Sequence, residues 1–132
     1  MVHYLSVLDV VSLHQQVMEQ AGLFSVPLRS EDLLESALMR AQAVAYYTDA
    51  DLAMQASVLA IGISQNQPFL DGNKRTALFS LLMFVGINGF RYTGDPYEIA
   101  DQLIAVAERE GPLDEATASF AGWLRERLVP RP

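Results

Sequence analysis

The chain has 132 residues, close to the commonest size of a single domain, so we expect one domain over residues 1–132 without a second core. Hydrophobic residues make up 51% of the sequence and charged residues only 19%, which excludes an intrinsically disordered chain or a coiled coil. Sixteen acidic and nine basic side chains give a net charge of −7 at pH 7, and no direct nucleic-acid partner is expected, because such binding needs clustered positive charge.

Two helices are predicted in the first third of the chain. From Leu5 to Ala21 apolar residues recur at helical spacing, and Ser6 is placed to cap the first turn. Ser30 is the expected N-cap of a second helix, because the two acidic residues after it suit the positive end of a helix dipole. We expect this helix to fade near Gln42. The stretch 43–51 has no clear helical face and is predicted to be a loop or a short extended flap.

Four more helices are predicted in the rest of the chain. The third helix is apolar on more than one side, so we expect it near the centre of the molecule. A loop containing Pro68 and Gly72 separates it from a strongly apolar fourth helix. The predicted ranges run from Asp49 or Asp51 to Ile63, from Thr76 to Ile87, from Asp95 to about Glu110, and from Asp114 to a stop at Pro130. With at most one strand, at 90–94, the pattern predicts a compact all-α domain of about six helices with a short flap.

Cysteine usage and apolar runs suggest where the protein resides. The sequence contains no cysteine, and therefore no disulfide, no thiolate zinc site and no cysteine nucleophile, which fits a cytoplasmic location. Residues 1–9 lack the basic and apolar pattern of a secretory signal. The longest apolar run, Ala77–Ile87, falls well short of the ~20 residues that cross a bilayer, so no membrane partner is expected.

One short segment concentrates the groups that phosphate binding needs. Residues 71–76 read Asp-Gly-Asn-Lys-Arg-Thr and stand at the start of the fourth predicted helix. A helix N-terminus offers unpaired N–H groups and partial positive charge, and Gly72 has no Cβ to obstruct a ligand. Lys74 and Arg75 add formal charge, and Asp71 is able to hold a divalent cation. The same residues also fit an ordinary turn followed by a solvated pair of cations, and the segment alone leaves both interpretations open.

A longer stretch around this segment resembles a known family. Residues 65–77 read Gln-Asn-Gln-Pro-Phe-Leu-Asp-Gly-Asn-Lys-Arg-Thr-Ala, which is similar to the Fic/Doc motif His-Pro-Phe-x-Asp/Glu-Gly-Asn-Gly/Lys-Arg. The short length, the order of the helices and the segments 4–14 and 33–38 resemble the Doc (death-on-curing) branch. The resemblance implies an all-α fold that transfers part of ATP to a hydroxyl of a target protein. Most members transfer AMP, whereas Doc toxins transfer the γ-phosphate to elongation factor Tu.

The resemblance also implies a role for each matching residue. Asp71 is expected to bind Mg²⁺, and Phe69 to anchor the loop in the core. The cradle for the phosphates of ATP is expected to consist of Gly72, Asn73, Lys74 and Arg75. The stretch 43–51 is expected to be the flap that aligns the target. Doc-type toxins are restrained by a separate Phd-like antitoxin, which is therefore an expected partner.

One position departs from the motif: Gln67 stands where the family has its catalytic histidine. An amide has no useful basicity near neutral pH, so Gln67 can bind a hydroxyl but cannot remove its proton, and we expect impaired or absent transfer. The substitution is natural or engineered, or another base serves in its place. His3 and His14 are poor candidates for that base, and we expect His14 to be a core residue bonded to a backbone carbonyl. The alternative function is a catalytically inactive protein-interaction module with the same fold.

Overall fold

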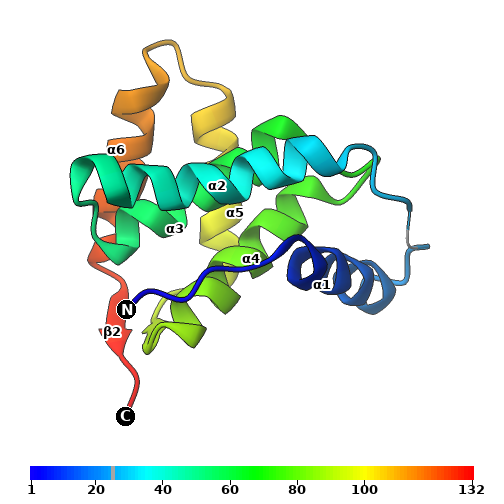
Figure 1. The fold of residues 1–132 in the computed structure, drawn as a ribbon, viewed down its shortest axis with the longest axis horizontal. Coiled ribbons are helices and arrows are strands. Elements are labelled where there is room, and N and C mark those ends of the chain that lie inside the picture. The colour runs from blue at the N-terminus through cyan, green and yellow to red at the C-terminus, as the bar shows by residue number, and fades with distance from the viewer. Residues whose placement is uncertain (25) are drawn as a thin grey trace.

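Six helices and one small sheet make up the computed structural model, which describes residues 1–24 and 26–132 (Figure 1). The elements are α1 (Val7–Gln20), α2 (Glu31–Thr48), α3 (Leu52–Asn66), α4 (Asn73–Ile87), β1 (Phe90–Tyr92), α5 (Pro96–Ala107), α6 (Leu113–Arg125) and β2 (Leu128–Pro130). The prediction of an all-α domain with about six helices is confirmed. None of the described helices is long and apolar enough to span a membrane.

The third helix forms the centre of the domain, as its apolar pattern predicts. From Ala53 to Ser64 every residue of α3 except Met54 is buried, and α3 packs against α2, α4, α5 and α6 (Figure 1). The approach to α2 is closest at Gly62, where a Cβ atom would lie 3.0 Å from the Cβ of Ala37. Because α3 is packed on nearly all sides, its C-terminal end is held in place, and this fixes where the following loop begins.

Side-chain caps fix the starts of four helices. Ser6 accepts a hydrogen bond from the Asp9 N–H and the Asp9 carboxylate accepts one from the Ser6 N–H, forming a capping box at α1. Three further helices begin after cap side chains that accept a backbone N–H, namely Ser30, Asp51 and Asp95. These starts agree with the sequence predictions, which rest on the same local chemistry.

The prediction of a loop or flap at 43–51 is wrong for 43–48, which are helical, and only 49–51 form a loop. Helix α2 continues to Thr48, because no glycine or proline interrupts this stretch, and it ends at Asp49 in a left-handed conformation with φ 54°. At the opposite end of the α2–α3 pair, where α2 begins and α3 ends, the Asn66 side chain donates a hydrogen bond to the Leu33 carbonyl. About 15 helical residues separate Leu33 from Thr48, so the C-terminal end of α2 lies roughly 20 Å along the helix from the end that contacts Asn66, and the structure places no flap from 43–51 beside the motif.

The sequence allows the strand at 90–94, where β1 lies, but it misses the partner strand β2 and the true start of α4. The last helix ends at Arg125 rather than continuing to Pro130, because residues 128–130 pair with β1. Strand β1 pairs antiparallel with the C-terminal β2, and Arg91 lies opposite Val129. Three-residue strands carry too little alternation to be recognised. Helix α4 begins at Asn73 rather than Thr76, which places the cationic residues of the motif inside its first turn.

Candidate active site

The loop between α3 and α4 begins with a residue in an uncommon backbone conformation. Gln67 ends α3 with φ 50° and ψ 58°, a left-handed geometry that few residues other than glycine adopt. Its side chain is exposed. Arg29 holds the backbone here, since its Nε lies 2.9 Å from the Gln67 carbonyl and its Nη2 lies 3.0 Å from the Asn66 carbonyl. A cation therefore binds the negative end of α3 and fixes the backbone of Gln67, the residue at the position of the motif histidine.

Asn73 closes this loop from the other side. The Phe69 N–H donates to Asn73 Oδ1 over 3.0 Å, and Asn73 Nδ2 donates to the Phe69 carbonyl over 2.9 Å. The Phe69 ring is 1% exposed, so it anchors the loop in the core as expected. The Asn73 side chain thus holds the loop and is not the N-cap of α4, and what remains for a ligand is its backbone N–H and the second hydrogen of its amide group.

His14 of α1 supports the same loop from below. Its ring is 2% exposed and stacks on Phe69 with centroids 3.8 Å apart and planes 4° from parallel. Its Nε2 lies 3.0 Å from the Asp71 carbonyl, and because a carbonyl only accepts, Nε2 carries the donated hydrogen. His14 is therefore the core histidine that the sequence predicts.

Gly72 packs against Met18 and His14 with little room for a side chain. A Cβ atom at Gly72 would lie 2.6 Å from the Met18 sulfur and 3.4 Å from His14 Nε2. Its φ of 80° is also left-handed, a second reason for glycine. The path of the chain into α4 therefore depends on the absence of a side chain at this position.

The first turn of α4 presents unpaired donors. Its N-cap, Gly72, supplies no side-chain cap, and the first helical bond runs from the Thr76 N–H to the Gly72 carbonyl over 2.9 Å. Within the described chain, no protein acceptor faces the N–H groups of Asn73, Lys74 and Arg75. The Gly72 N–H is bound by Asp71 Oδ1 at 2.8 Å. Three amides, rather than four, are therefore open to an anion.

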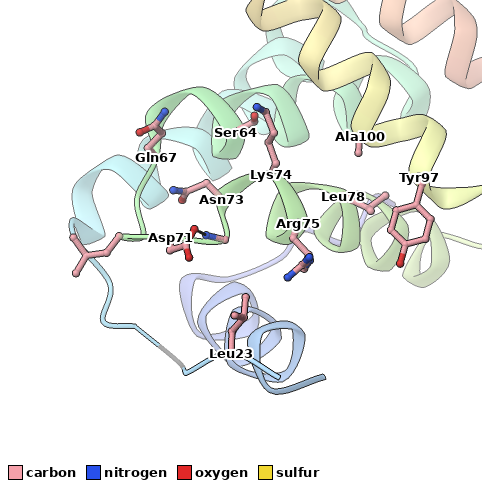
Figure 2. A pocket seen from close by; sticks show the side chains of 12 residues that line it. Leu23, Ser64, Gln67, Asp71, Asn73, Lys74, Arg75, Leu78, Tyr97 and Ala100 are labelled. Atoms are coloured by element: carbon pink, nitrogen blue, oxygen red, sulfur yellow. Dashed lines mark hydrogen bonds between the residues drawn. The ribbon is translucent and has the colours of Figure 1, made fainter. Parts of the chain in front are cut away.

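These donors face a cleft of about 580 Å³, within the range of small-molecule sites. Figure 2 shows that Lys74 and Arg75 leave α4 in opposite directions, Lys74 toward Ser64 and Arg75 away from it. The exposed carboxylate of Asp71 lies on the same cleft wall. The lining residues are Leu23, Ser64, Gln67, Leu70, Asp71, Gly72, Asn73, Lys74, Arg75, Leu78, Tyr97 and Ala100. All the residues expected at the site, except the stretch 43–51, therefore meet at one cleft.

Comparison with known proteins now gives the family. A family model described as "Fic/DOC family" matches residues 4–85, which include α1, α2, α3 and nearly all of α4. The chain belongs to the Fic/DOC family. Over 100 residues it is 36% identical to the toxin Doc of Mycolicibacterium smegmatis, covering 73% of this chain and 77% of that protein. It is 31% identical over 105 residues to the protein kinase doc of Escherichia phage P1, covering 77% of this chain and 80% of that protein.

Several residues of this Fic/DOC site lie outside the motif, and sequence reasoning missed their roles. Arg29 acts through backbone carbonyls 37 and 38 residues away, and Tyr97 reaches the cleft from α5. No local pattern marks such contacts, because they depend on how the helices pack. Tyr97 also lies beyond the residues that the family match covers.

Proposed function

We propose that the chain is a Doc-like toxin that transfers phosphate or AMP from ATP to a hydroxyl of a target protein, with transfer impaired or absent because of Gln67. The observation that carries the proposal is the first turn of α4, where three unpaired N–H groups and two cations face a cleft of about 580 Å³. Phosphate groups bind to this combination of helix N-terminus and positive charge.

Mg²⁺ is the metal that we propose to bind with ATP at Asp71. One oxygen of this carboxylate accepts the Gly72 N–H, and the other has no protein partner in the described chain. The described residues contain no cluster of three or more metal-binding side chains. A single carboxylate is sufficient, because Mg²⁺ is commonly held by one or two carboxylates together with substrate phosphates and water. When bound, Mg²⁺ supplies positive charge that neutralises the phosphates.

Side chains of the protein itself bind the phosphates and the target hydroxyl in this proposal. Arg75 offers a planar fork to phosphate oxygens, and Lys74 offers a mobile point charge on the other side of α4. In this proposal Gln67, at the end of α3, hydrogen-bonds an incoming hydroxyl but accepts no proton from it. Loss of a general base typically slows a reaction 10²–10⁴-fold, while binding is retained. We therefore propose a site that binds nucleotide better than it turns it over.

The partners are proposed from the relatives. Since one similar protein is named a toxin and another a protein kinase, we propose a toxin–antitoxin role, with a Phd-like antitoxin as the restraining partner and phosphate as the favoured transferred group. Elongation factor Tu is the proposed target. The alternative, an inactive interaction module, gains support only from Gln67, because the open amides of α4 leave the phosphate cradle unblocked.

Calorimetric titration with ATP and Mg²⁺ tests the nucleotide site. We expect the Arg75→Ala variant to bind ATP at least tenfold more weakly, since a charge-assisted hydrogen bond contributes about 1.5–3 kcal/mol. Arg91→Ala is the matched control, because Arg91 is exposed on β1 away from the cleft. Equal affinity in the original protein and the Arg75→Ala variant would contradict the proposed site.

Restoring the base tests transfer. The Gln67→His variant should keep the fold, because histidine is among the residues that tolerate left-handed geometry, and Gln67→Asn is a matched control that tolerates it without adding a base. A bacterial lysate with ATP radiolabelled at the α- or γ-phosphate then reports which group moves. We expect label only with Gln67→His and from the γ-phosphate. A folded Gln67→His protein that labels nothing with either form of ATP would contradict the proposed transfer.

A further inference from the structure

A second, smaller cleft adjoins the first where Gln67 and Lys74 meet. It has a volume of about 340 Å³ and is lined by Ser64, Gln65, Gln67, Lys74, Ala107 and Arg109. Ser64, Gln67 and Lys74 line both clefts, so the two spaces meet at the catalytic position. The far wall of the smaller cleft comes from the end of α5, beyond the residues of the family match.

The charge of this cleft is opposite to that of the protein. Lys74 and Arg109 line it and no acidic side chain does, in a chain with a net charge of −7. Glu108 and Glu110 flank Arg109 in the sequence, but neither lines the cleft. Two cations with no carboxylate among the lining residues make the cleft attractive to an anion.

Arg109 is held in place while most of its donors stay open. Its Nη1 donates to the Val106 carbonyl over 2.8 Å, which fixes the guanidinium at the negative end of α5. Within the described chain the other guanidinium nitrogens have no acceptor. An arginine anchored by one N–H can bind a phosphate group with the remaining ones at a reduced entropic cost.

The direction of Lys74 connects the two clefts. In Figure 2 its amino group points toward Ser64, a residue of both clefts, whereas Arg75 points away. The open amides of α4 belong to the same turn as these two cations. An anion that extends across this turn therefore meets Arg75 at one end and the pair Lys74 and Arg109 at the other.

We propose that the smaller cleft binds the terminal phosphate of a polyphosphate chain and that Arg109 is its specific ligand. The inference rests on the proposed function, in which the amides of α4 bind the rest of that chain. It predicts selection by the number of phosphates: a nucleoside triphosphate reaches Arg109, whereas a monophosphate does not. Arg109 is thus a substrate-binding residue outside the motif.

The test is calorimetric titration of the full chain with AMP, ADP, ATP and inorganic triphosphate, each with Mg²⁺. We expect Arg109→Ala to weaken the binding of ATP and triphosphate about tenfold or more, since it removes a charge-assisted contact, and to leave AMP binding within about twofold. Arg109→Lys should give an intermediate loss, because it keeps the charge and loses the fork. Arg91→Ala should change none of the affinities.

The outcomes separate this inference from the proposed function. If ATP binding depends on Arg75 but not on Arg109, the inference is wrong and the proposed function stands. If Arg109→Ala weakens AMP as much as ATP, selection by phosphate number is refuted. If triphosphate binds through Arg109 while ATP does not bind at all, the inference holds and the nucleotide function fails. If none of the four anions binds, both are wrong. Urea unfolding of each variant verifies that the fold is intact.

Discussion

Substitution of His14 tests how the active-site loop is held. This ring makes two separable contacts, the stack on Phe69 and the hydrogen bond from Nε2 to the Asp71 carbonyl. His14→Phe keeps a flat ring and removes the hydrogen bond, whereas His14→Ala removes both. The pair therefore measures the two contacts one at a time.

The expected magnitudes follow from these contacts. Loss of one hydrogen bond of this kind lowers the free energy of unfolding by about 0.5–1.5 kcal/mol, which we expect for His14→Phe. Removal of a buried aromatic ring adds a cavity, and comparable changes to alanine lower the free energy of unfolding by about 3–5 kcal/mol, which we expect for His14→Ala. Urea unfolding followed by circular dichroism measures both.

Nucleotide binding shows whether the hydrogen bond also positions the site. Because Asp71 and Gly72 lead directly into the open amides of α4, we expect His14→Phe to weaken ATP binding about threefold to tenfold. Val10→Ala is the matched control, since Val10 is fully buried on the same helix and lines neither cleft. If His14→Phe leaves stability and ATP affinity unchanged, or if Val10→Ala weakens ATP binding equally, the assigned role of His14 is refuted.

Three other predictions concern stability. Asp51 caps α3 and accepts two hydrogen bonds from Arg125, so Asp51→Ala should lower the free energy of unfolding by about 1–2 kcal/mol, more than Arg125→Ala, as measured in urea. The hydrogen bond from Arg125 lowers the pKa of Asp51 below 3.8. The stabilisation that this ion pair gives is therefore complete above pH 3.8 and is lost as the pH falls through the lowered pKa. The Arg125→Ala variant should lose less stability on acidification than the original protein, and an equal loss would contradict this. Asn73→Ala removes both bonds to Phe69 and should lower the free energy of unfolding by about 1–3 kcal/mol, so an unchanged urea midpoint would contradict the loop geometry.

Much of the fold was predictable because its signals are local. The caps of α1, α2, α3 and α5 combine a short polar side chain with an apolar period, and both can be read within a few residues. The end of α2 was mispredicted because Tyr46 and Tyr47 are exposed and form no buried stripe, although the helix continues through them. Tertiary context and the absence of a helix breaker decide that stretch.

The site was predictable only where it is a motif. Residues 71–75 are contiguous, and their chemistry can be read from the sequence alone. The contacts that hold the loop come from residues far away in the sequence: Arg29 bonds the Asn66 carbonyl 37 residues later, and His14 bonds the Asp71 carbonyl 57 residues later. Arg109, which lines the adjoining cleft, follows the motif in the sequence. Asn73 shows the limit within the motif itself, since nothing in the sequence indicates that its side chain bonds the backbone of Phe69.

The left-handed backbone of Gln67 has a consequence for inheritance. Its carbonyl is fixed by Arg29 and its own N–H by Ile63, whereas its side chain is exposed. Codons for glutamine and histidine differ in one base. A single nucleotide change therefore exchanges an amide for a base at the centre of the cleft while the scaffold around it stays as it is. Under the proposed function, a lineage that carries this gene is therefore one mutation away from the histidine of the Fic/Doc motif.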